Sequence, residues 1–115
     1  MQVQVNTDRN VADGEGLATR ISTELRSRLA RYSEQITRIE VHLSDVNGDK
    51  SGGSDKRCLI EARLEGRHPQ VASDQAATPE AACSGAARKL LSGLETTFSR
   101  LGRFKGAASI RTGDR

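Results

Sequence analysis

The hydrophobic period changes halfway along residues 17–47, and this change constrains the fold more than any other feature of the sequence. In the first half, apolar residues recur every three or four positions: Leu17, Ile21, Leu25, Leu29 and Tyr32. This spacing is typical of a helix with one buried face. In the second half, Ile39, Val41 and Leu43 alternate with polar residues, as in a strand with one solvent-exposed face. The short connection predicts that this helix and strand are neighbours that pack their apolar faces together.

Three further segments are predicted strands, because polar and apolar residues alternate along them. They are residues 1–6, residues 57–66 and, more weakly, residues 70–77. A polar, glycine-containing loop separates the strand around Val41 from the strand that begins at Arg57. These two strands are therefore expected to form an antiparallel hairpin.

The sequence Thr78-Pro79-Glu80 predicts the start of a second helix. It supplies an N-cap, a proline at the first helical position and an acidic residue in the first turn. The face that this helix would bury carries residues at helical spacing: Cys83, Ala87, Leu90, Leu94, Phe98 and Leu101. Gly85 and Gly93 weaken a helix, which a close approach to the sheet or to the first helix would explain.

The expected order of elements is β-α-β-β-β-α, and the predicted fold class is α+β. Four strands form one sheet, and the two helices can lie side by side on one of its faces, which gives a two-layer sandwich. A chain of 115 residues suits a single domain. Gly102 is expected to end the second helix, so residues 1–102 are the predicted domain and residues 103–115 a basic, disordered tail.

The formal net charge of +3 comes from the end of the chain, where residues 102–115 contain four basic residues and one acidic residue. Any argument for nucleic-acid binding must therefore rest on where the charges lie rather than on their sum. Cys58 and Cys83 lie on predicted apolar faces and are expected to be buried free thiols. Neither a signal peptide nor a membrane span is recognisable, so we expect a cytoplasmic protein.

No motif in the sequence indicates catalysis, and we predict no catalytic residue, metal site or cofactor. The two histidines, His42 and His68, have no nucleophile or carboxylate constellation in sequence around them. A nucleotide-binding or hydrolase motif is also missing. The loop after Asp45 begins like a calcium-binding loop, but Lys50 and Lys56 occupy the positions that require glycine and glutamate. We therefore expect a protein that is not an enzyme.

Taken together in order, four segments resemble the ribosome hibernation-promoting factors, also known as ribosome-associated inhibitor A or sigma-54 modulation proteins. The segments are MQVQVN, RLARYSEQITRIEVHLSD, RCLIEARLEG and AACSGAARKLLSGLE. The resemblance covers about residues 1–101 and is to a short form of the family. It rests on the order and spacing of these segments rather than on a sharp signature.

This resemblance implies a translation-inhibiting factor without enzymatic activity. Such proteins bind the small ribosomal subunit between its head and body, where they overlap the sites of messenger RNA and transfer RNA and hold the ribosome idle under stress. Basic side chains of the helical layer would contact phosphates of the 16S-type ribosomal RNA, with recognition by shape. A membrane, DNA or a small-molecule substrate is not an expected partner.

Basic residues on the two predicted helices are the candidate RNA-binding residues: Arg20, Arg28, Arg31, Arg88, Lys89, Arg100 and Arg103. Arg28, Arg31 and Lys89 fall where the resembled family has basic residues, and the basic residues of both helices could merge into one patch. The stripe of Arg20, Glu24, Arg28 and Arg31 also fits a solvated face with internal Arg–Glu pairs.

Two alternatives of the same topology stay open. One is an adaptor that binds a protein other than the ribosome, because residues 95–99 lack the basic cluster common in the resembled family. The other is a module like a double-stranded-RNA-binding domain. That class favours lysines at the start of its last helix, whereas this helix is predicted to begin with Pro79 and Glu80.

Overall fold

The computed structural model describes residues 1–8, 16–46 and 56–109, with side chains as far as residue 99. Its elements follow the predicted order. They are β1 (Gln2–Thr7), α1 (Leu17–Arg28), the short 3₁₀ helix η1 (Ala30–Tyr32), β2 (Ile36–Asp45), β3 (Lys56–Leu64), β4 (Gln70–Ala76) and α2 (Pro79–Ser109). The predicted α+β class and β-α-β-β-β-α order are thereby confirmed.

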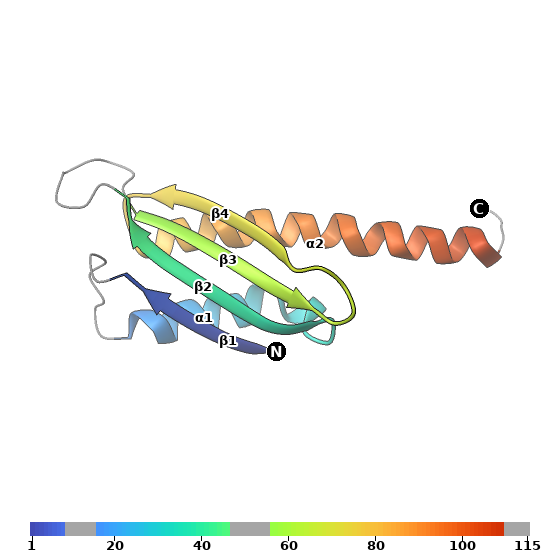
Figure 1. Ribbon diagram of the computed structural model, residues 1–115, viewed down its shortest axis with the longest axis horizontal. Coiled ribbons are helices and arrows are strands. Elements are labelled where there is room, and N and C mark those ends of the chain that lie inside the picture. The colour runs from blue at the N-terminus through green and yellow to red at the C-terminus, as the bar shows by residue number, and fades with distance from the viewer. Residues whose placement is uncertain (9–15, 47–55, 110–115) are drawn as a thin grey trace.

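The four strands form one mixed sheet in the spatial order β1-β2-β3-β4. The strands β2, β3 and β4 are antiparallel neighbours, as the hairpin prediction required, and Val41 lies opposite Ile60. Strand β1 runs parallel to β2, with Val3 opposite Ile39. Parallel neighbours need a connection that crosses the sheet, and α1 supplies it (Figure 1).

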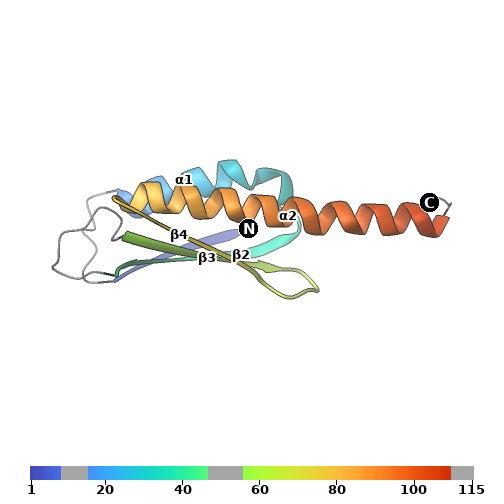
Figure 2. The same ribbon diagram turned by 90° about the horizontal axis from the view of Figure 1, so that it is seen from above.

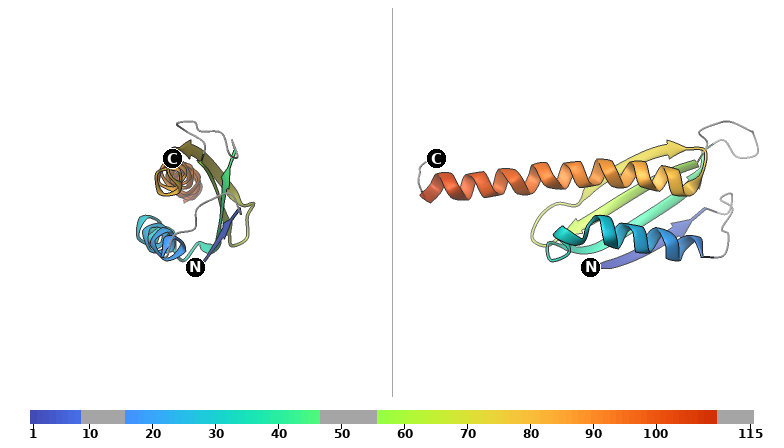
Figure 3. Two further views of the ribbon diagram at one scale, coloured as in Figure 1. Left: turned by 90° about the vertical axis from the view of Figure 1, so that its left-hand side faces the viewer. Right: turned by 180° about the vertical axis from the view of Figure 1, so that it is seen from behind.

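Both helices cover the same face of the sheet, which confirms the predicted two-layer sandwich. Figure 2 shows α1 and α2 on one side of the strands, and the left view of Figure 3 shows them side by side when seen from the end. The opposite face of the sheet has no covering element among the described residues. It carries most of the polar and charged residues that alternate with the core residues along β2 and β3.

The core is aliphatic and lies between the helices and the sheet. Its members are the apolar residues that the two periodicities predicted, including Leu25 and Leu29 at the end of α1, Ile39 and Val41 of β2, and Leu90 of α2. The apolar faces of the helices pack on the apolar face of the sheet, because each is buried only by contact with the other layer.

Cys58 of β3 and Cys83 of α2 are free and buried, as predicted. Their sulfur atoms lie 3.2 Å apart within the core. The hydrogen bond between the thiols, together with burial, raises the pKa of Cys58 far above its ordinary value.

Both helices end differently from the sequence-based expectation. The α-helical geometry of α1 stops at Arg28, and the chain continues through η1 as a tighter 3₁₀ turn that carries Tyr32 into the core. The predicted stop of α2 at Gly102 is wrong, because the helix continues to Ser109 and extends past the sheet (Figure 1). A glycine inside a helix costs about 1 kcal/mol but does not by itself end it. The domain boundary at residue 102 stays a prediction, and most of the loop compared with a calcium site lies outside the described residues.

Candidate nucleic-acid interface

The charges of the chain are divided unevenly between its two layers. As far as residue 99, the helices carry six basic residues: Arg20, Arg26, Arg28, Arg31, Arg88 and Lys89. They carry three acidic residues: Glu24, Glu80 and Glu95. The strands are balanced, with Arg38, Lys56, Arg57 and Arg63 against Glu40, Asp45, Glu61 and Asp74. The helices therefore carry the larger net positive charge, which favours contact with a polyanion.

Polar side chains bridge α1 and η1 to α2 in a row that we name the interhelical seam. Its members are Arg20, Glu24, Arg28, Arg31, Glu80, Ser84 and Glu95. The two helices run in the same direction along this row, as the right view of Figure 3 shows. The seam thus places Arg20 of α1 and Arg31 of η1 opposite glutamates of α2.

Each end of the seam is an interhelical ion pair, and its middle is a shared carboxylate. Arg20 Nη2 lies 2.9 Å from Glu80 Oε2 at one end. In the middle, Glu24 Oε2 accepts hydrogen bonds from Arg28 Nε and from Ser84 Oγ, both at 2.8 Å. The pair of Glu24 and Arg28 confirms the internal Arg–Glu pairing that their spacing suggested.

The other end of the seam combines an ion pair with stacked rings. Arg31 Nη1 lies 3.2 Å from Glu95 Oε2, and its guanidinium carbon lies 5.0 Å from the centre of the Tyr32 ring. Tyr32 in turn stacks on Phe98 with 5.4 Å between ring centres, and Arg67 lies over the Phe98 ring at 5.6 Å. This column joins η1, α2 and the β3–β4 turn.

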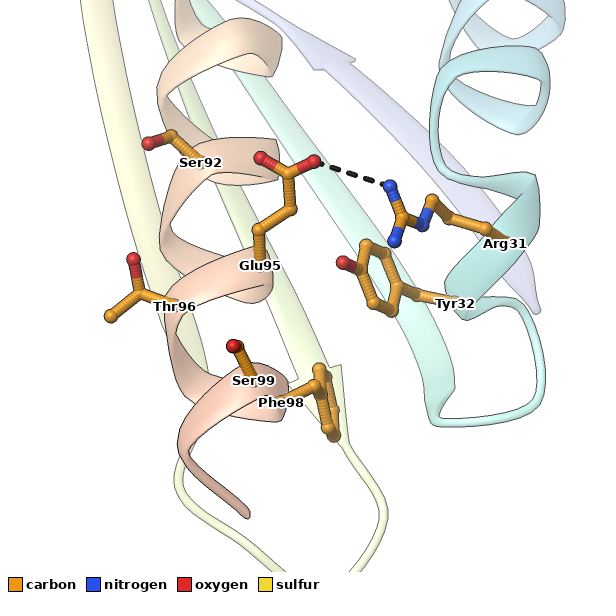
Figure 4. A pocket seen from close by; sticks show the side chains of 7 residues that line it. All are labelled: Arg31, Tyr32, Ser92, Glu95, Thr96, Phe98 and Ser99. Carbon is orange, nitrogen blue, oxygen red and sulfur yellow. Dashed lines mark hydrogen bonds and ion pairs between the residues drawn. The ribbon is translucent and has the colours of Figure 1, made fainter. Parts of the chain in front are cut away.

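A hollow of about 590 Å³ opens beside the column, between η1 and α2. Arg31 and Tyr32 line it from η1, and Ser92, Glu95 and Ser99 line it from α2 (Figure 4). Figure 4 shows Glu95 reaching across the gap toward the Arg31 guanidinium. The lining is a cation, a carboxylate and hydroxyl groups over an aromatic floor, which suits a polar ligand.

A family model described as Sigma 54 modulation protein / S30EA ribosomal protein matches residues 4–101 of this sequence. The chain belongs to this family. Its members are ribosome-associated factors, which confirms the resemblance seen in the sequence. The match spans most of β1, all of α1, η1, β2, β3 and β4, and most of α2, so the interhelical seam lies entirely within it.

Two solved structures share the fold of this family member. The crystal structure of the Thermus thermophilus Protein Y N-terminal domain matches with a TM-score of 0.61 and 21% sequence identity, over 84% of this chain and 94% of that one. A ribosomal subunit interface protein from Coxiella burnetii matches with a TM-score of 0.67 and 13% identity, over 86% and 99%. A comparison with curated proteins found no match.

The structure divides the seven predicted RNA-binding residues of this family member. Arg20, Arg28 and Arg31 come together along the seam. Lys89 lies on the other flank of α2, where its Nζ contacts the Ser73 carbonyl oxygen at 3.2 Å and Asp74 Oδ1 at 3.4 Å. The expected single patch is therefore split, because Lys89 projects toward β4 rather than toward α1.

The remaining three candidates lie on α2. Arg88 is exposed on this helix, and its charge helps to lower the pKa of Asp74. Arg100 and Arg103 belong to the last part of α2, and their side chains lie outside the described residues. The RNA-binding role of all seven stays a prediction.

Most charged residues on the open face of the sheet form ion pairs with one another. Glu40 Oε2 lies 3.1 Å from Arg38 Nε and 3.9 Å from Arg63 Nη2, and Glu40 Oε1 lies 3.6 Å from His42 Nε2. On this face Arg38, Arg57 and Arg63 stand against Glu40 and Glu61, because Asp45 and Asp74 lie on the side of the sheet that faces the helices. Its net charge of +1 is smaller than the +3 of the helices.

Within the described residues, no group of three or more histidine, cysteine, aspartate or glutamate side chains is arranged to hold a metal ion. None of the described helices combines the length and hydrophobicity that crossing a membrane requires.

Proposed function

We propose that this chain binds the small ribosomal subunit through its helical layer and holds it idle by occupying the channel used by messenger RNA and transfer RNA. Membership of a family of ribosome-associated factors supports the ribosome as the partner. The observation that carries the proposal is the excess of basic residues in the helices beside a sheet of balanced charge.

The seam arginines would contact phosphates of ribosomal RNA. Arg20 and Arg28 are separated by about 12 Å along α1 at 1.5 Å per residue, and Arg31 extends the row through η1. A row of guanidinium groups on a rigid layer suits a backbone of regularly spaced phosphates. Such contacts recognise the shape of folded RNA rather than its base sequence, and binding would release counterions.

A second function is favoured by the carboxylates of the seam. Arg20, Arg28 and Arg31 each have a glutamate partner, which reduces the positive potential that RNA would meet. An adaptor that binds another protein would tolerate such pairing better than an RNA-binding factor would.

Co-sedimentation with purified bacterial small subunits, at ~50 and ~200 mM salt, tests the proposal. The test variant is Arg28→Glu/Arg31→Glu. The matched control is Arg57→Glu/Arg63→Glu, which makes the same charge change on the open face of the sheet. Lys89→Glu tests the separate flank of α2.

The proposal predicts that the wild type binds at both salt concentrations and that the seam variant loses at least about tenfold in affinity, with a shallower salt dependence. The control variant should lose much less. In an in vitro translation assay, the wild type should reduce synthesis and the seam variant should not. Equal loss in the seam and control variants would contradict the proposed face, and absence of binding by the wild type would favour the adaptor.

A further inference from the structure

Glu95 is an isolated acidic residue on a basic helix. From residue 81 to residue 109, α2 contains Arg88, Lys89, Arg100, Arg103 and Lys105 in sequence, and Glu95 is its one acidic residue. It lies in the middle of the helix, opposite Arg31. A negative charge at this point weakens the surface that the proposed function needs, so its position calls for a physical reason.

The other two glutamates of the seam have structural reasons for their positions. Glu80 lies in the first turn of α2, where the helix dipole stabilises a negative charge. Glu24 is half-buried and receives hydrogen bonds from two helices at once, from Arg28 and Ser84. Both carboxylates therefore stabilise the helical layer itself.

The pair of Glu95 and Arg31 lacks such a reason. Its side chains are 50% and 65% exposed, and one ion pair at 3.2 Å joins them. Exposed ion pairs add little to the free energy of unfolding, because water and salt screen them. The pair can therefore open at little cost to the fold.

Arg31 would stay in position if this pair opened. Its guanidinium lies over the Tyr32 ring, and this cation–π contact does not depend on Glu95. A guanidinium group has five N–H donors, and Glu95 accepts from one nitrogen, Nη1. Ser92 and Ser99 also line the hollow beside Arg31.

We propose that Glu95 is an internal competitor that occupies Arg31 in the free protein, and that a phosphate of the RNA backbone displaces it and takes the hollow beside Arg31. This inference rests on the proposed function, and it identifies an RNA phosphate as the group that binds beside Arg31. It also gives the carboxylate a role in specificity. An acidic protein surface offers Arg31 the same carboxylate that it already has, whereas RNA offers a phosphate within a polyanion whose binding also releases counterions.

Two probes test the inference: purified small subunits by co-sedimentation, and a fluorescein-labelled oligouridylate by fluorescence anisotropy. Glu95→Gln removes the charge and keeps a hydrogen-bond acceptor. Glu34→Gln is the matched control, because it removes one exposed charge close to η1 from a residue without an ion pair to Arg31. Arg31→Met, alone and combined with Glu95→Gln, removes the cation while keeping a long side chain over Tyr32.

Glu95→Gln is expected to tighten RNA binding about two- to fivefold, steepen its salt dependence and leave the melting temperature unchanged. Glu34→Gln should change the affinity much less, and Glu95→Gln should have no effect in the Arg31→Met protein. Equal gains in Glu95→Gln and Glu34→Gln, a gain that survives Arg31→Met, or weaker binding by Glu95→Gln would each overturn the inference.

The two probes separate this inference from the proposed function. The expected pattern on the oligouridylate, without binding of any variant to small subunits, would support Glu95 as a competitor and contradict the ribosomal proposal. Binding to small subunits that is lost in Arg28→Glu/Arg31→Glu but unchanged in Glu95→Gln would support the ribosomal proposal and contradict the role of Glu95 as a competitor.

Discussion

Gly85 of α2 faces the carboxylate of Asp74 of β4 so closely that a β-carbon on residue 85 would lie 2.7 Å from Asp74 Cγ and closer still to Oδ2. Asp74 Oδ1 accepts a hydrogen bond from the Gln75 backbone N–H at 2.9 Å, and Lys89 lies 3.4 Å from it. The predicted close approach of this glycine to the sheet is thereby confirmed. Gly85 lets α2 lie directly on the edge strand.

Gly85→Ala should destabilise the protein, although alanine is the better helix former by about 1 kcal/mol. The new methyl group would force Asp74 away from Gln75 and Lys89 or push α2 off β4, at a cost of about 1–3 kcal/mol. Urea denaturation followed by circular dichroism measures the change.

Gly93→Ala is the control for this helix. A β-carbon there would lie 3.1 Å from Gln70 Oε1, the end of a flexible side chain, so the variant should be neutral or slightly stabilised. The double variant Gly85→Ala/Asp74→Ala should recover part of the loss, because the contact is then removed from both sides. Equal stability of Gly85→Ala and Gly93→Ala would show that the contact is not close.

Asp74 should make the stability of the protein depend on pH in the acid range. The hydrogen bond from the Gln75 N–H, then the contact with Lys89, lowers the pKa of Asp74 below its ordinary value. A lowered pKa stabilises the fold above the unfolded-state value of about 3.9, and this stabilisation is lost as the pH falls through the folded-state pKa. The melting temperature of the wild type should therefore fall more steeply below pH ~4 than that of Asp74→Asn. Parallel curves for the two proteins would refute this role.

The two cysteines should be unreactive in the folded protein. Their thiolates are the reactive forms, whereas the hydrogen bond between the thiols and burial raise the pKa of Cys58. At neutral pH, a colorimetric disulfide reagent should therefore react rapidly with both thiols in guanidinium chloride. In native buffer both thiols should react much more slowly, because reaction there requires opening of the core. Rapid reaction of one thiol in native buffer would mean that the core around it opens easily.

Phe98→Ala should destabilise the protein by about 2 kcal/mol, less than a fully buried phenylalanine would. The variant loses the stack on Tyr32 and the contact with Arg67. Phe98→Leu should lose about half as much, because it keeps the apolar volume but not the ring. Ser99→Ala, at the exposed neighbouring position, should lie within about 0.5 kcal/mol of the wild type.

Local periodicity predicted the elements of this fold well, because each buried stripe shows in the spacing of its own residues. The apolar positions from Leu17 to Leu43 are buried as expected. Periodicity does not specify which strand lies beside β1 or in which direction, because that choice depends on contacts between segments far apart in sequence. The end of α2 was missed for another reason, since Gly102 can either end a helix or lie within it.

The sequence indicated the cations of the candidate interface but not their partners. The pair Glu24–Arg28 was predictable because four residues separate its members on one helix. Glu80 and Glu95 reach Arg20 and Arg31 across some sixty residues of chain, and such pairs depend on how two helices lie on the sheet. The same placement decides that Lys89 projects toward β4.

The parallel pairing of β1 with β2 constrains the order in which the sheet can form during synthesis. As the chain leaves the ribosome, β1 emerges first, but its neighbour in the sheet begins at Ile36, after the whole of α1. Strands β2, β3 and β4 instead emerge next to their partners. Strand β1 therefore cannot form its hydrogen bonds with β2 until α1 and β2 have been synthesised. The entropy of closing this long connection must be lost before β1 joins the sheet, so we expect its pairing to be the late step.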